Sequence, residues 1–157
     1  RGSNMSRITP SMAKNAIKRS LRSIVDCELT KSEKSDIWDH FSSQCAYCGR
    51  VLSKEGREGH IDHLDPITHN GTNHISNRVL SCSQCNGDEK REEGWQSFLD
   101  KKISDRETRE EYKQKIKGWI EKNPLQNKPI DEIALQQHID NVCKAFDNAV
   151  TSLREGK

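Results

Sequence analysis

Cys45-Ala46-Tyr47-Cys48 and Cys82-Ser83-Gln84-Cys85 are two C-x-x-C pairs, and they decide how the middle of this chain folds. Each C-x-x-C turn supplies two thiolates, and two such turns fill all four positions of a tetrahedral zinc site. A single pair could equally be a redox motif, but two pairs this close together favour zinc. Because protein ligands fill the whole coordination shell, the predicted Zn²⁺ site is structural and not catalytic.

The segment between the two pairs, residues 49–81, carries side chains suited to phosphodiester hydrolysis. Asp62 offers a carboxylate to a hard divalent cation, and His63 offers an imidazole that can take a proton from water. Neighbouring residues of a strand point to opposite faces, so these two can cooperate only where the strand ends or twists. Asn86 adds an amide oxygen after the second pair, although an Asn that opens a helix is also an ordinary N-cap.

Several positions between Asp62 and Asn86 resemble, in type and order, the motif of the HNH endonucleases: Asp62-His63, Pro66, Gly71, Asn77 and Asn86. That family has a ββα-metal fold, often stapled by a zinc ion on two C-x-x-C pairs, and the resemblance covers residues 45–90. It implies that His63 is the general base and that Asn77 holds the loop and orients His63 by hydrogen bonding. It also implies that Asp62 and Asn86 ligate the catalytic cation, Mg²⁺ or Mn²⁺.

The chain departs from the family pattern after the last motif residue. In relatives with Asn at that position a lysine often follows three residues later, whereas here Glu89 fills the place and Lys90 follows it. Lys90 and Arg91 are predicted to contact DNA phosphate, and the offset leaves open which of them does. His60 lies on the same strand face as Asp62, so it could join the metal or be a polar surface residue.

Helical patterns flank this segment, so the predicted fold class is α+β, with a small ββα-metal core. Apolar spacing predicts a helix over residues 11–26, and Thr30 with Glu33 forms a capping box that opens a second one. Two short strands are expected within residues 50–61, the first at Val51-Leu52, and a helix is expected from near Asn86. Three regions follow: 5–42, basic and helical; 43–92, the zinc-stapled nuclease core; and 93–157, helical.

The C-terminal region is predicted to hold two long helices. Ser104 and Glu107 form a capping box for the first, and Pro129 is expected in the first turn of the second. The last helix repeats apolar residues at steps of four and three: Leu135, Ile139, Val142, Phe146, Ala149 and Leu153. This seam either packs on its own domain or forms a homodimer through the C-terminal helix.

Bulk composition limits the core and says little about partners. Hydrophobic residues make up 31% of the chain and charged residues 32%, so a structural metal would add needed folding free energy. The net charge of +2 is too near neutral to indicate nucleic acid. The segment before Val25 nevertheless lacks acids and carries basic residues that could follow duplex DNA or be a solvated face: Arg7, Lys14, Lys18, Arg19 and Arg22.

Cysteine usage predicts a cytoplasmic protein, because paired C-x-x-C spacing favours a metal in a reducing compartment. No signal peptide and no apolar run of about 20 residues is seen, so no membrane association is expected. The four residues before Met5 are interpreted as a tag remnant.

Three functions are compatible with these patterns. They are a metal-dependent DNA endonuclease of HNH type, a zinc-stapled nucleic-acid-binding module without catalysis, and a protein-interaction adaptor built on the long helices. The intact Asp62-His63 pair favours the nuclease, because a module that only binds has no need of a base beside a metal ligand.

Overall fold

The fold is described by a computed structural model that covers residues 7–125 and 129–156. The chain forms two compact units: one is Glu28–Asn127, and the other combines Arg1–Cys27 with Lys128–Lys157. Helices and a two-stranded antiparallel sheet make up the described chain, which confirms the predicted α+β class. The division into regions 5–42, 43–92 and 93–157 stays a prediction.

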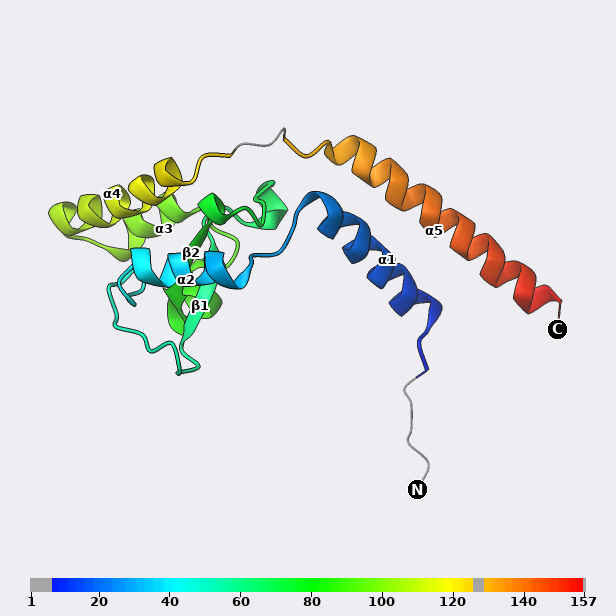
Figure 1. Ribbon diagram of the computed structural model, residues 1–157, viewed down its shortest axis with the longest axis horizontal. Helices are drawn as coiled ribbons and strands as arrows, with labels where there is room; N and C mark the ends of the chain where they lie inside the picture. Colours follow the sequence, from blue (N-terminus) through cyan, green and yellow to red (C-terminus); the bar gives the residue numbers. More distant parts are fainter. Residues whose placement is uncertain (1–6, 126–128, 157) are drawn as a thin grey trace, which may run out of the picture. The chain divides into compact units, whose positions relative to one another are not determined.

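Helix α2 (Lys31–His40) opens the larger unit, and its N-terminus is capped as predicted. The Thr30 hydroxyl accepts a hydrogen bond from the Glu33 N–H at 3.2 Å, and the Glu33 carboxylate accepts one from the Thr30 N–H at 2.7 Å. These bonds satisfy two N–H groups that a helix start leaves without partners. One side of α2 packs against strand β2 (Arg78–Cys82), as Figure 1 shows, with Ile37 fully buried.

Strand β1 (Gly59–His63) pairs with β2 in antiparallel register, with His63 opposite Arg78. The predicted strand at Val51-Leu52 is wrong: Val51 makes only an isolated bridge to Gln44, and its side chain is 73% exposed. The partner of β1 follows the long loop instead: it is β2, where Val79 and Leu80 are both fully buried, so both faces of that strand are covered. Two 3-10 turns, Ile67–His69 and Ile75–Asn77, shape that loop.

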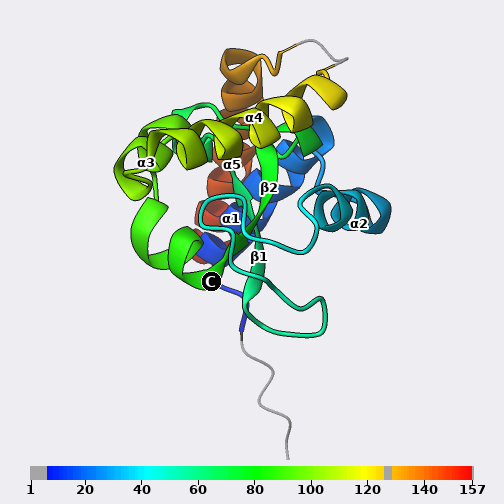
Figure 2. The same cartoon turned by 90° about the vertical axis from the view of Figure 1, so that its left-hand side faces the viewer.

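Helices α3 (Trp95–Lys102) and α4 (Arg106–Lys122) pack against each other, as Figure 2 shows. The predicted capping box at Ser104 is displaced by one residue. Asp105 is the N-cap, and its carboxylate accepts a hydrogen bond from the Thr108 N–H at 2.8 Å. Aspartate is as good an N-cap as serine, so the start of α4 stays capped despite the one-residue shift.

Trp119 of α4 joins that helix to the start of β2. Its side chain is fully buried, and its indole N–H donates to the carbonyls of Ile75 at 3.0 Å and Arg78 at 2.9 Å. The ring also packs 6.0 Å, centre to centre, from Phe41 at the end of α2. Trp119 therefore fixes the backbone at Arg78, the first residue of β2, which lies opposite His63.

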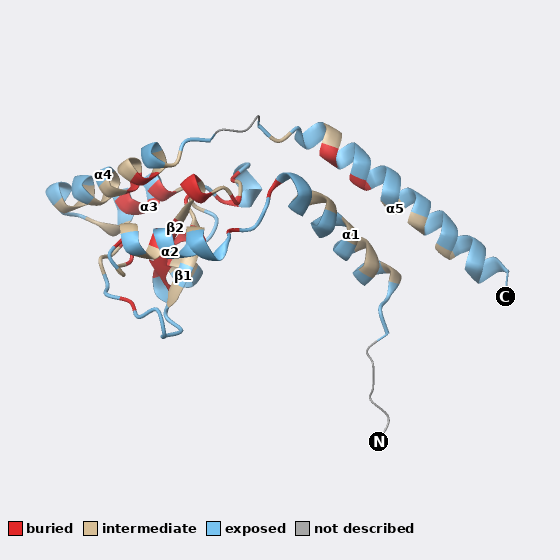
Figure 3. Ribbon diagram, in the orientation of Figure 1, coloured by how far each residue is buried: buried red, intermediate tan, exposed pale blue. Residues whose placement is uncertain are grey.

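Helices α1 (Pro10–Val25) and α5 (Glu132–Glu155) form the second unit and run antiparallel (Figure 1). Little of this pair is buried (Figure 3): α1 has no buried residue, and only Leu135 and Ile139 are buried in α5. Pro129 precedes α5 and does not lie in its first turn as predicted, because Asp131 caps the helix by accepting from the Ala134 N–H at 2.9 Å. None of the described helices is long and apolar enough to cross a membrane.

Candidate metal centre and active site

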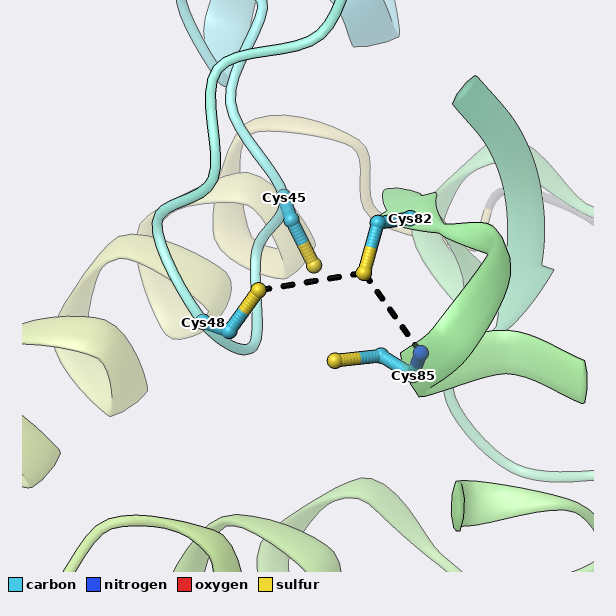
Figure 4. A group of neighbouring side chains, drawn as sticks. All are labelled: Cys45, Cys48, Cys82 and Cys85. Atoms are coloured by element: carbon cyan, nitrogen blue, oxygen red, sulfur yellow. Dashed lines mark hydrogen bonds between the residues drawn. The ribbon is translucent and has the colours of Figure 1, made fainter. Parts of the chain in front are cut away.

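Four cysteines from three elements converge on one point (Figure 4). Cys45 and Cys48 lie in the turn after α2, Cys82 is the last residue of β2, and Cys85 lies in a π-helix, Gln84–Lys90. Gly49 takes a positive φ of 71° in this turn, a conformation that glycine adopts without strain, and its N–H donates to the Cys45 carbonyl at 2.9 Å.

The geometry of this cysteine cluster fits zinc. All four sulfur atoms lie within 4.8 Å of one another, and Cys48 Sγ is 3.8 Å from Cys82 Sγ. A tetrahedral site with Zn–S bonds of about 2.3 Å has edges of about 3.8 Å, whereas a disulfide bond is about 2 Å long. The predicted four-cysteine cluster is therefore confirmed, and its closed donor set suits a structural metal.

Hydrogen bonds among the thiols favour one thiolate in the cluster. The thiols of Cys48 and Cys85 donate to Cys45 and hold the pKa of Cys45 well below its ordinary value. The same bond to Cys45 raises the pKa of Cys48 to about 11. A divalent cation would stabilise the remaining thiolates, which is how such clusters couple metal binding to folding.

A cavity of about 290 Å³ at the end of β1 brings together four residues that the sequence predicts. Its lining consists of Asp62, His63, Asn86 and Arg91, together with Pro66, Ile67, Thr68 and Glu92. Strand β1 ends at His63, which is the condition under which adjacent side chains can reach one site. Asp62 and Asn86 both carry oxygen donors, the ligand type that Mg²⁺ and Mn²⁺ prefer.

Asp62 is held by two buried partners. Its Oδ2 accepts a hydrogen bond from the Tyr47 hydroxyl at 3.0 Å, and the Lys90 ammonium lies 3.3 Å from the same oxygen. Burial raises the pKa of the Asp62 carboxyl, while the charge of Lys90 and the hydrogen bond from Tyr47 act in the opposite direction. The carboxylate is thus fixed in orientation through one oxygen at the wall of the cavity.

Lys90, which the motif predicts to contact DNA, points into the protein and not toward solvent. The residue is 2% exposed, and its ammonium donates to the His63 carbonyl at 2.7 Å. The π-helix explains the offset from the family pattern, because its i→i+5 turn holds one residue more than an α-helical turn. Lys90 thereby reaches Asp62, while Glu89 lies outward and pairs with Lys102.

Arg91, the residue after Lys90, is exposed and lines the cavity. Its backbone φ is 47°, a left-handed conformation that is unfavourable for a residue with a side chain. Of the two cations that the sequence places near phosphate, Arg91 is the one with a side chain at the surface of the cavity.

The His63 ring forms a polar triangle with Asn73 and Arg78. Nε2 of His63 lies 2.9 Å from Asn73 Oδ1 and 2.5 Å from Arg78 Nη1, and Arg78 Nη1 donates to the same Asn73 oxygen at 2.9 Å. Sequence reasoning missed both partners. The register of β1 against β2 would have revealed Arg78, since it places Arg78 opposite His63.

Asn77 closes the loop between the strands. Its amide Nδ2 donates to the carbonyls of Asp65 at 3.0 Å and Thr72 at 2.9 Å, and its Oδ1 accepts from the Asp65 N–H at 2.9 Å. Gly71 packs so closely beneath this loop that a Cβ atom would lie 1.9 Å from the Asp65 carbonyl oxygen. The hydrogen bonds shown for Asn77 thus go to the loop, and those shown for the His63 ring go to Asn73 and Arg78.

The remaining predicted residues lie away from the cavity or in the other unit. His60 is exposed on β1 and does not line the cavity. In α1, Lys14 pairs with Asp147 at 2.8 Å, and Arg22 forms two hydrogen bonds to the Glu132 carboxylate at 3.0 Å. The other two predicted DNA contacts are exposed: Lys18 and Arg19.

Comparison with known proteins identifies the central segment. Residues 45–92 match the family model described as HNH endonuclease, which confirms the resemblance seen in the sequence. No curated protein sequence matches the chain. Among solved structures, the chain is similar to the crystal structure of Streptococcus thermophilus Cas9 in complex with AGGA PAM, with 16% identity and a TM-score of 0.43. That similarity covers 88% of this chain and 16% of the Cas9 chain.

Proposed function

We propose that this protein is a metal-dependent DNA endonuclease that hydrolyses phosphodiester bonds at the cavity beside β1. The observation that carries the proposal is that Asp62, His63 and Asn86 line one cavity, within the segment that matches the HNH endonucleases. A module that only binds nucleic acid has no need for a base, a carboxylate and an amide oxygen around one space.

His63 is the proposed general base. A neutral imidazole has one nitrogen with a lone pair, and that nitrogen accepts the proton of the attacking water. The ring is half-buried, and its contacts with Asn73 and Arg78 restrict its rotation at the mouth of the cavity. Such fixed orientation is what general-base catalysis needs.

Asp62 and Asn86 are the proposed holders of the catalytic cation, Mg²⁺ or Mn²⁺. Tyr47 and Lys90 fix the Asp62 carboxylate through Oδ2, and the π-helix presents Asn86 to the same cavity. When bound, the cation supplies positive charge that stabilises the phosphate and the leaving oxygen. Arg91, on the cavity surface, is proposed to contact the phosphate of duplex DNA, with its guanidinium as the donor group.

The test is nicking of supercoiled plasmid in Mg²⁺ or Mn²⁺, with an EDTA control. The substitution His63→Ala is expected to lower the nicking rate by about 10²- to 10⁴-fold, the usual contribution of a general base. His60→Ala is the matched control, because His60 lies on the same strand but outside the cavity, and it is expected to keep the wild-type rate.

Zinc content and melting temperature establish that both variants are folded. Nicking by His63→Ala at the wild-type rate would remove His63 as the base. Absence of nicking by folded, zinc-loaded wild-type protein with either cation would reject the nuclease proposal and favour the binding module.

A further inference from the structure

We propose that Arg78 is a positioning residue for the reaction: it holds the His63 imidazole in one orientation and one tautomer, together with Asn73. This inference rests on the proposed function, since it assigns a role toward the proposed general base. It adds a residue that lies outside the Asp62, His63, Asn77 and Asn86 set read from the sequence.

The contacts of the Arg78 guanidinium restrict the orientation of the His63 imidazole. Nη1 of Arg78 lies 2.5 Å from His63 Nε2 and donates to Asn73 Oδ1 at 2.9 Å, while Nη2 donates to the Ile61 carbonyl at 3.3 Å. Arginine carries donors only, so the Asn73 atom that faces it must be the carbonyl oxygen. The side-chain amide of Asn73 is thereby fixed, and with it the acceptor that lies 2.9 Å from Nε2.

Either arrangement of hydrogens in this triangle depends on Arg78. In one, Nε2–H and Nη1–H both donate to the Asn73 oxygen; in the other, Nη1 donates one hydrogen to Nε2 and its second to Asn73. In both, removal of the guanidinium leaves the Asn73 amide without the charged donor that orients it. General-base action requires the first arrangement, because Nε2–H then donates to Asn73 and the lone pair lies on Nδ1, where it can accept the proton of the attacking water. In the second arrangement the one lone pair, on Nε2, already accepts a hydrogen bond from Arg78. Arg78 therefore acts by fixing the Asn73 oxygen as the acceptor of Nε2–H.

The rest of the larger unit holds Arg78 itself in place. Cross-strand pairing sets Arg78 opposite His63, and the buried Trp119 indole N–H donates to the Arg78 carbonyl at 2.9 Å. Asn73 is 9% exposed, so its amide is confined as well. A base held by neighbours that are themselves fixed by packing keeps its orientation when substrate arrives.

The first experiment compares Arg78→Met, Arg78→Lys and the matched control Arg109→Met. Arg109 is also half-buried, but it lies on α4, where it donates to the Ile103 carbonyl. Arg78→Met is expected to lower the single-turnover rate of plasmid nicking by about 10²-fold, as expected for a misplaced catalytic group. Arg78→Lys should recover part of that loss, and Arg109→Met should leave the rate unchanged.

DNA affinity separates positioning from phosphate contact. Binding of a duplex oligonucleotide, measured in EDTA over a range of salt concentrations, should be the same for Arg78→Met and wild type. If the slope of log K against log salt concentration is smaller in Arg78→Met by about 0.9, the amount for one phosphate contact, Arg78 is a DNA ligand and the proposal is overturned.

The ring itself supplies a readout that does not require activity. The nitrogen chemical shifts of the His63 imidazole, recorded where the ring is neutral, should show one tautomer in the wild type and a mixture in Arg78→Met and Asn73→Ala. An unchanged tautomer ratio in Arg78→Met overturns the inference, even if wild-type protein cleaves DNA. Conversely, an inactive wild type would defeat the proposed function, while the tautomer measurement would still decide the role of Arg78.

Discussion

The two compact units of this protein are stabilised by different kinds of interaction. The larger unit has a buried core that includes the cysteine cluster and Trp119, whereas α1 has no buried residue and α5 has only two. Ion pairs of Lys14 and Arg22 with acids of α5 join the two helices. Exposed ion pairs contribute about 0–1 kcal/mol each, while full burial of one large apolar side chain contributes about 1.5–3 kcal/mol.

Most of the buried side chains that stabilise this protein therefore lie in the larger unit. The proposed active site lies entirely in the larger unit, where the cysteine cluster, a strand pair and helices fix the side chains around one cavity. The α1–α5 pair buries only Leu135 and Ile139 among its described residues. If the contacts indicate stability correctly, substitutions in the larger unit should have larger effects than substitutions in the α1–α5 pair.

The largest effect on stability is expected from Cys82→Ser, which removes one of the four thiolates of the cysteine cluster. Apparent binding free energies of structural zinc are about 10–16 kcal/mol in small zinc peptides, which exceeds the whole stability of many domains. We expect loss of zinc and unfolding of residues 28–127, with the helices α1 and α5 retained. All three tryptophans lie in the larger unit, so their fluorescence reports its unfolding alone, and residual helical circular dichroism reports the pair.

Cys143→Ser is the matched control, because Cys143 lies on α5 outside the cluster. It should keep its zinc and the tryptophan emission of the wild type. If Cys82→Ser also keeps both, the proposed ligand set is wrong. If it instead removes the helical signal of α1 and α5, the two units do not fold independently.

A smaller effect is expected from Trp119→Phe, which removes the indole N–H that two carbonyls share. Leaving buried acceptors without a donor costs about 1–3 kcal/mol, so the denaturant midpoint should fall by a corresponding amount. Trp38→Phe is the control, since Trp38 is only half-buried and no indole hydrogen bond is seen for it among the described contacts. Equal losses in the two variants would show that ring volume, and not the hydrogen bond, matters.

Local rules predicted much of this structure because the relevant interactions are short in sequence. The capping box of Thr30 and Glu33 forms within one helical turn, and each C-x-x-C pair presents its two thiols from a single turn. The motif from Asp62 to Asn86 also located one wall of the cavity. These features follow from capping, turn and metal chemistry, which act over a few bonds.

Long-range pairing could not be predicted in the same way. Arg78 faces His63 only because β2 pairs with β1, and that strand was expected at Val51 instead. Lys90 turns inward because the π-helix holds one residue more per turn than an α-helix. No sequence pattern predicts that extra residue. Trp119 reaches β2 from α4, across 41 residues. Strand pairing, one extra residue in a helical turn and helix–sheet packing decided these three outcomes.

A DNA-binding effect is expected next in size, if α1 lies along phosphates. The double substitution Lys18→Gln and Arg19→Gln removes two exposed charges and should lower the salt dependence of duplex binding by up to about 0.9 for each lost contact. The pair Lys14→Gln and Arg22→Gln is the control, because carboxylates of α5 already offset those charges. A salt slope that neither double variant changes would make α1 structural only.

The smallest effect is expected from Arg22→Gln in the α1–α5 pair. Hydrogen bonds from Arg22 hold the pKa of Glu132 below its ordinary value, so the pair stabilises the folded helices above the unfolded pKa. This contribution is lost as the pH falls through the lower folded pKa, when Glu132 takes up a proton. At neutral pH and low salt we expect Arg22→Gln to speed hydrogen exchange of α1 and α5 amides slightly, as fits a pair worth about 0.2–1 kcal/mol.

Below the folded pKa of Glu132, the amides of wild type and variant should exchange at the same rate, while amides of the larger unit should not respond at either pH. A difference that persists in acid would mean that Arg22 acts through packing and not through its charge.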